Sequence, residues 1–183
     1  MRNYLCLLIP VLLLSIPASA QPKTLPQLND IQSDTLEIGM LVLGGWAIVN
    51  ILISSFKLTR ATRNRKYFYQ MNLYWNLVNL IIASVALYSI LSKDQSAQNL
   101  ADSLYLHSWY KKVLYLNVGL DLGYMLLGAY LKERSRNSYK AERLMGWGQA
   151  VILQGLFLLL LDVVLVVLLE SIAGHLFRLV PQL

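Results

Sequence analysis

Two carboxyl side chains, Asp121 and Asp162, stand inside long apolar runs of this 183-residue chain. A lone ionised carboxylate in such surroundings has to be protonated, hydrated or bound to a cation, because a bare charge is too unstable in an apolar medium. No Lys, Arg or His accompanies the two aspartates within these runs. If the aspartates are neighbours, we expect them to share one proton. The residues therefore point to the binding of a proton or a cation.

Amide side chains interrupt the same apolar runs and form two candidate groups. The first group joins the aspartates to two amides, Asn117 and Gln154, as an intramembrane polar site. The two aspartates are expected at matching depths, roughly 10–12 Å below the outer boundary, with Asn117 one turn closer to the surface and Gln154 near the midplane. The second is an amide cluster expected in the cytoplasmic half: Asn50, Asn76, Asn79 and Gln149. Interhelical hydrogen bonds of about 0.6–2 kcal/mol each explain such amides equally well. A structural role is favoured for the amides, and both roles stay open for the aspartates.

Other site chemistries find little support in the residues. His107 and His175, both expected at the outer surface, are too few for a closed metal site, which takes three or four ligands. No axial haem ligand lies inside an apolar run, and the only cysteine is Cys6. No nucleotide-binding loop, nucleophile elbow or metalloprotease helix is present. We therefore predict no metal, no cofactor and no catalytic residue, and the chain is not expected to be an enzyme.

The elements that carry these residues are four apolar runs. The chain is 56% hydrophobic and only 14% charged, whereas soluble domains carry about a quarter of charged residues. Spans of about 20 residues cross a bilayer as helices, and they are expected at residues 37–56, 71–91, 112–131 and 144–169. The predicted fold class is therefore all-α, a four-transmembrane-helix bundle within a membrane domain of residues 36–183. In the last span, Gly148, Gly155 and Asp162 share one face, which suits close contact with another helix.

The first 20 residues have the features of a secretory signal peptide. Arg2 precedes a short apolar stretch, and Ala18, Ser19 and Ala20 form a small-residue cleavage site. Cleavage is favoured, and the alternative is an uncleaved first transmembrane helix. Residues 21–35 are then predicted to be a short exported polar segment.

Charge predicts the topology. The connections at residues 57–66 and 132–143 hold five Lys or Arg each, and basic residues near span ends are retained in the cytoplasm. A cleaved signal followed by four spans places the same connections inside. Both mature termini are thus expected outside a bacterial cytoplasmic (inner) membrane. The net charge of +6 reflects this topology and contact with the lipid bilayer, with no nucleic acid as partner.

Four segments carry a resemblance to a known family. They are GMLVLGGWAIVN, QMNLYWNLVN, NVGLDLGYMLLGAYL and GWGQAVILQGLFLLLLD, which lie between Gly39 and Asp162. They are similar to the four helices of a family of small, uncharacterised bacterial membrane proteins, catalogued as a domain of unknown function. The resemblance implies four helices and an exported N-terminus. It transfers no activity, ligand or catalytic residue.

Two hypotheses about function follow. The first is a transport-like or ion- or proton-responsive membrane protein with a polar site between its helices. The alternative is a non-catalytic membrane scaffold or subunit, which binds a partner protein or a second copy in a homo-oligomer through its polar and small-residue stripes. The substrate and the physiological process are not encoded in any recognisable motif.

Overall fold

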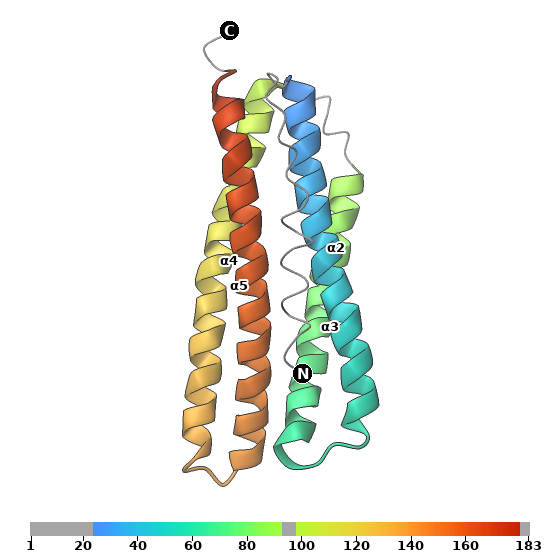
Figure 1. Ribbon diagram of the computed structural model, residues 1–183, viewed down its shortest axis with the longest axis vertical. Coiled ribbons are helices and arrows are strands. Elements are labelled where there is room, and N and C mark those ends of the chain that lie inside the picture. Colours follow the sequence, from blue (N-terminus) through green and yellow to red (C-terminus); the bar gives the residue numbers. More distant parts are fainter. Residues whose placement is uncertain (1–23, 93–97, 180–183) are drawn as a thin grey trace.

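The fold is a bundle of four long α-helices, as a computed structural model shows for residues 24–92 and 98–179 (Figure 1). The helices are α2 (Leu25–Leu58), α3 (Arg63–Leu91), α4 (Leu100–Ser135) and α5 (Ala141–Phe177). The all-α prediction is confirmed for this part of the chain, which contains no strand. All four helices are long and apolar enough to cross a membrane, which indicates a multi-pass membrane protein. The predicted signal peptide, residues 1–20, lies outside the described residues.

Every helix is longer than its predicted span. α2 begins at Leu25 and so includes residues 25–35 of the predicted polar segment, with Leu28 and Gln32 buried. Its start is capped by the side chain of Gln27, which accepts a hydrogen bond of 3.0 Å from the backbone N–H of Thr24. α4 begins at Leu100, where the side chain of Asn99 accepts from the backbone N–H of Asp102 at 2.9 Å. Side-chain caps at polar residues thus start both helices well before the apolar runs.

Helix α5 is the centre of the bundle, because it packs against each of the other three helices and most extensively against α4. Glycines permit the close approach to α4. A Cβ atom on Gly148 would lie 2.6 Å from the carbonyl oxygen of Gly128, and one on Gly155 would lie 3.1 Å from that of Asp121. The predicted small-residue face of α5 therefore contacts α4 inside the chain. α2 packs on α3, whereas α3 and α4 pack on other helices and scarcely touch each other.

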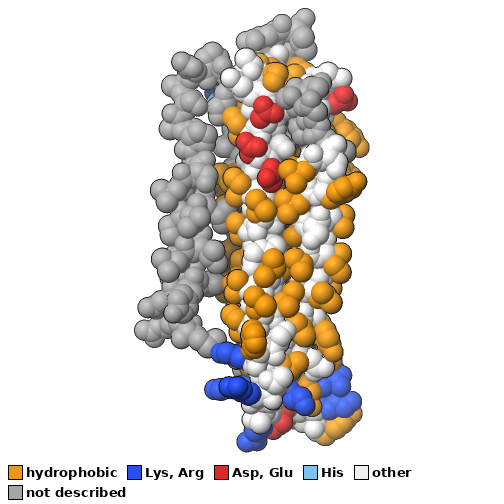
Figure 2. All heavy atoms as spheres, turned by 90° about the vertical axis from the view of Figure 1, so that its right-hand side faces the viewer, with side chains coloured by type: hydrophobic (Ala, Val, Ile, Leu, Met, Phe, Trp, Pro, Cys, Tyr) orange, Lys and Arg blue, Asp and Glu red, His pale blue; other side chains and the backbone are white. Residues whose placement is uncertain are grey.

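The two short connections between paired helices lie at the same end of the bundle (Figure 1). Figure 2 shows Lys and Arg side chains gathered at this end, with a long hydrophobic surface above it. Arg63 of α3 and Glu142 of α5 form a salt bridge of 2.8 Å there. We call this end the basic end and the opposite one the far end. Large apolar side chains such as Leu126 and Val85 are exposed between the two ends, as expected of helices that face lipid.

Candidate functional site

Polar side chains meet inside the bundle in two places, and the first is a hydrogen-bonded network in the half nearer the basic end. Asn72 of α3 is its centre. The Nδ2 group of Asn72 donates to Oδ1 of Asn50 at 3.0 Å and to Oγ of Ser54 at 2.9 Å, both on α2. Nε2 of Gln154, on α5, donates to Oδ1 of Asn72. One buried amide thereby joins three helices.

The same network includes an aromatic residue of α2. Nε1 of Trp46 donates to Oε1 of Gln154 at 3.0 Å, and the Trp46 ring stacks on Phe157 with centroids 4.0 Å apart. Asn76, one turn after Asn72, donates to the backbone oxygen of Asn72 at 2.7 Å. We call this set the amide network: Trp46, Asn50, Ser54, Asn72, Asn76 and Gln154. Among the described residues, only one of its side-chain N and O atoms is buried without a partner, Oδ1 of Asn76.

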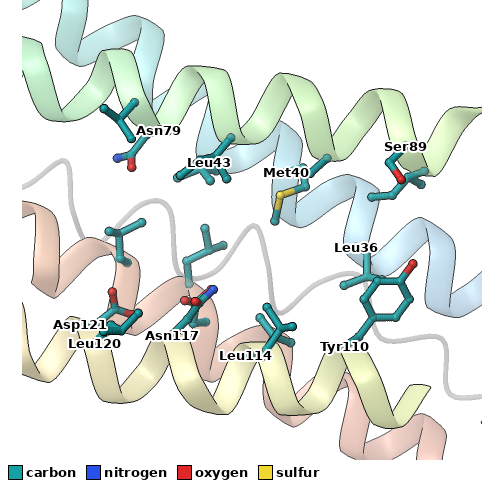
Figure 3. A pocket seen from close by; sticks show the side chains of 18 of the residues that line it. Leu36, Met40, Leu43, Asn79, Ser89, Tyr110, Leu114, Asn117, Leu120 and Asp121 are labelled. Carbon is teal, nitrogen blue, oxygen red and sulfur yellow. The ribbon is translucent and has the colours of Figure 1, made fainter. Parts of the chain in front are cut away.

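The second place is a cavity of about 430 Å³ on the far-end side of the network, which we call the carboxyl cavity. It lies between α3 and α4, and residues of α2 and α5 also line it. Figure 3 shows Asn79 reaching into this space from α3, and Asn117 and Asp121 reaching into it from α4. Asp162 of α5 also lines it. Most of the remaining wall is apolar, with side chains such as Met40.

The two aspartates meet at the wall of the carboxyl cavity. The side chain of Asp162 adjoins those of Asp121 and Asn117. Two adjoining carboxyl groups can form a hydrogen bond only if one of them is protonated, because ionised carboxylates only accept. Both residues are buried, with Asp121 only 2% exposed. The geometry therefore suits a pair that shares one proton or exchanges it for a cation.

Two polar atoms at this wall lack a partner among the described residues. They are Oδ2 of Asp121, an acceptor, and Nδ2 of Asn79, a donor. Asn79 is 4% exposed, so water outside the bundle does not hydrogen-bond to its side chain. Buried polar atoms are rarely left unpaired, and those that are need an explanation. Here they form a second acceptor and a donor beside the carboxyl pair.

An aromatic pair stands between the two polar places. Trp75 of α3 and Tyr124 of α4 meet edge to face, with ring centroids 4.8 Å apart and planes at 87°. Both line the carboxyl cavity. Each lies about one helical turn nearer the basic end than Asn79 and Asp121 respectively. This pair therefore forms the end of the cavity that is nearest the amide network.

The structure rearranges the two predicted groups. It brings Asp121, Asp162 and Asn117 together, but it places Gln154 in the amide network. Gln154 lies eight residues before Asp162, which turns it by about 80° around α5, away from α4 and toward α2 and α3. Asn79, predicted in the cytoplasmic amide cluster, lines the carboxyl cavity instead.

One predicted member of the amide cluster is not part of it. Gln149 is exposed, because it lies about 140° around α5 from Gln154. The centre of the network, Asn72, was not among the predicted site residues. A signal for it exists in the sequence, since Asn72, Asn76 and Asn79 fall in one stripe of α3 at helical spacing.

The two histidines, both expected at the outer surface, differ in burial. His107 is buried, and its Nδ1 lies 2.6 Å from Oε1 of Gln32 on α2. α4 extends past His107 and packs it against the equally extended α2. Its position at the outer surface of the membrane stays a prediction. His175 is exposed and bonds to the backbone oxygen of Ser171 within its own helix.

Comparison with known proteins gives one match. A family model described as "Family of unknown function (DUF6992)" matches residues 42–163. The matched stretch contains the whole amide network together with Asp121 and Asp162. No curated protein and no solved structure matches the chain significantly.

Proposed function

The chain belongs to this family of unknown function, and we propose from its geometry that it is a proton- or cation-responsive, transport-like protein of the membrane. The responding group is the carboxyl pair of Asp121 and Asp162. The observation that carries the proposal is that two buried aspartates from different helices adjoin at the wall of one cavity between the helices. Asn117 and Asn79 complete the polar wall.

The surroundings of the pair support an exchange of its proton. The described residues that line the cavity include no Lys, Arg or His. A second negative charge on the pair therefore has no fixed cation to neutralise it, and a mobile proton or cation has to do so. Intramembrane ionisable groups with these properties mark ion and proton paths in membrane proteins.

Tryptophan fluorescence of the purified chain in lipid nanodiscs tests the proposal, because Trp75 lines the cavity. We expect a transition as the pH is varied, shifted by Na⁺ or K⁺ at constant ionic strength. Asp121→Asn and Asp162→Asn should each abolish it. Asp34→Asn, a change at an exposed carboxylate of α2, should leave it unchanged. A wild type without a transition, or a transition that survives in both site variants, would overturn the proposal.

For the scaffold alternative, an exposed glycine face of α4 is a candidate surface for a partner. The buried polar and glycine stripes are used for contacts within the chain, but Gly119 and Gly123 of α4 have nothing within 4 Å of an added Cβ. They are four residues apart, on the face opposite Asp121, and this spacing favours close packing of two membrane helices. A second copy of the chain fits this face. Crosslinking in membranes should give a dimer that Gly119→Leu weakens and Gly45→Leu, on the exposed side of α2, does not.

The proposed location is the cytoplasmic membrane of a bacterium, with the basic end inside and both mature termini outside. The basic residues near the ends of α2, α3, α4 and α5 support this orientation. In this orientation the carboxyl cavity lies in the outer half of the bundle and the amide network in the inner half.

A further inference from the structure

The carboxyl cavity has more room and more apolar wall than a proton or a metal ion uses. Its volume of about 430 Å³ lies within the range of pockets that hold small organic ligands. Leucine, isoleucine, valine and methionine side chains from all four helices form most of its wall. A small inorganic cation gains nothing from such a wall, whereas an organic ligand buries apolar surface against it.

The carboxyl groups of the cavity and the amide of Asn79 lie toward one end. Asp121, Asp162 and Asn79 lie beside the Trp75–Tyr124 pair, and the wall toward the far end includes Trp109, Tyr110 and Ile90. Figure 3 shows Asn79 and Asp121 at one side of the view and the hydroxyl groups of Tyr110 and Ser89 at the other. A ligand that fits has a polar head at the carboxyl end and an apolar body that extends toward the far end.

The charge of that head follows from the atoms that meet it. Oδ2 of Asp121 is a buried acceptor without a partner among the described residues, next to the carboxyl of Asp162. Aromatic faces attract cations, and Trp75 and Tyr124 adjoin the pair. The titratable groups on the cavity wall are Asp121, Asp162, Tyr110 and Tyr124, while α2 and α3 contribute none. Nothing on the wall complements an anion.

We propose that the carboxyl cavity binds a lipophilic amine, whose protonated nitrogen takes the place of the proton shared by Asp121 and Asp162. The inference rests on the proposed function and names the ligand class of the same site. Charge balances in the exchange: one ammonium group enters, and the carboxyl pair releases one proton. The unpaired Nδ2 of Asn79 provides a donor for an acceptor atom on the ligand.

Three probes of one shape and different charge test the ligand class: naphthylmethylamine, naphthylmethanol and naphthylacetate. Each is titrated calorimetrically into the full chain in lipid nanodiscs, with empty nanodiscs as the blank. The amine should bind saturably and release a proton, which buffers of different ionisation enthalpy reveal. The alcohol should bind roughly 10–100-fold more weakly, because it lacks the charge-assisted hydrogen bond. Equal affinity of amine and alcohol, tighter binding of the acetate, or no binding of the amine would overturn the proposal.

A pair of variants keeps the test independent of the carboxylates. Ala86 lines the cavity, and Ser84 is exposed on the same stretch of α3 without lining it. Ala86→Phe should fill the space for the apolar body and abolish amine binding, while Ser84→Phe should leave it intact. Ser84→Phe should also keep the pH-dependent fluorescence transition. Amine binding that survives Ala86→Phe would place the ligand elsewhere and overturn the inference.

The two proposals fail in different ways. If the fluorescence transition is present and depends on Asp121 and Asp162, but the amine does not bind, the ligand class is wrong and the proton site stands. If the transition is absent, the proposed function fails. Amine binding that Asp121→Asn and Asp162→Asn leave unchanged would contradict recognition by the carboxyl pair in either case.

Discussion

The amide network and the carboxyl cavity lie next to each other in one bundle, but their polar side chains differ in how far they are hydrogen-bonded across helices. Asn76 belongs to the network and Asn79, one turn later on α3, belongs to the cavity. In the network, α2, α3 and α5 converge, and the amides bond to one another across three helices. The cavity lies between α3 and α4, which scarcely touch each other, and Asn79 and Asp121 each have a buried polar atom there without a partner among the described residues. The contrast fits a network that holds the helices together and the proposal that the cavity is the functional site.

The largest effect on stability is expected at the centre of the network. Asn72→Leu removes the partner of Gln154, Asn50 and Ser54 at once and leaves buried polar atoms unpaired. We expect a loss of about 2–4 kcal/mol in the free energy of unfolding. The measurement is thermal unfolding in detergent followed by circular dichroism. Gln149→Leu, a change at an exposed amide of α5, is the matched control and should have little effect. Equal losses in both variants would show that the network does not stabilise the bundle.

A somewhat smaller loss is expected where glycines separate α4 and α5. Gly148→Leu places side-chain atoms against the backbone of Gly128, and Gly155→Leu places them against Met125 and the backbone of Asp121. Each should destabilise the bundle by about 1–3 kcal/mol, with Gly148→Leu the more severe because backbone cannot move aside. Gly174 has open space around it, so Gly174→Leu should unfold like the wild type. A melting temperature of Gly174→Leu as low as that of Gly148→Leu would contradict the packing described here.

The carboxyl cavity should respond in the opposite manner. Asp162→Asn keeps the size of the side chain and provides an amide donor beside Asp121, so its unfolding free energy should change by less than about 1 kcal/mol. Its pH-dependent fluorescence transition should nevertheless disappear. Asn72→Leu should show the reverse, a lower stability with an unchanged transition. If Asp162→Asn unfolds as easily as Asn72→Leu, the aspartates are structural and the contrast between the two regions is lost.

Cysteine labelling tests the orientation of the two regions in the membrane and requires no measurement of stability. Single cysteines at Ser33, near the far end of α2, and at Ser138, in the connection at the basic end, are introduced in a Cys6→Ala background. A membrane-impermeant thiol reagent added to intact cells should label only position 33. Labelling of position 138 would invert the topology and place the cavity in the cytoplasmic half.

Much of the fold follows from the sequence, because apolar runs of sufficient length leave a membrane protein few alternatives. The four helices were predicted in the right order, and the seven-residue repeat of Gly148 and Gly155 identified the face of α5 that meets α4. The ends of the helices were not predicted correctly, because local caps at Thr24 and Asn99 decide where α2 and α4 begin. Hydropathy does not register such caps.

The site was predicted only in part. Asp121 and Asp162 could be paired from their expected depth in neighbouring helices. Depth does not specify which neighbour a side chain faces, and Gln154 was assigned to the wrong group for this reason. The cavity, which includes Asn79 and excludes Asn76, is lined by residues of all four helices. No pattern within a single helix reveals it.

Infrared spectroscopy of the full chain at neutral pH tests the central claim most directly, because it distinguishes a protonated carboxyl group from an ionised one. The wild type should show the carbonyl band of a buried carboxylic acid. The double variant Asp121→Asn/Asp162→Asn should lack this band, and Asp34→Asn/Asp102→Asn, which removes two exposed carboxylates, should retain it. A wild type without the band, or a band that persists in Asp121→Asn/Asp162→Asn, would contradict a proton shared by the carboxyl pair.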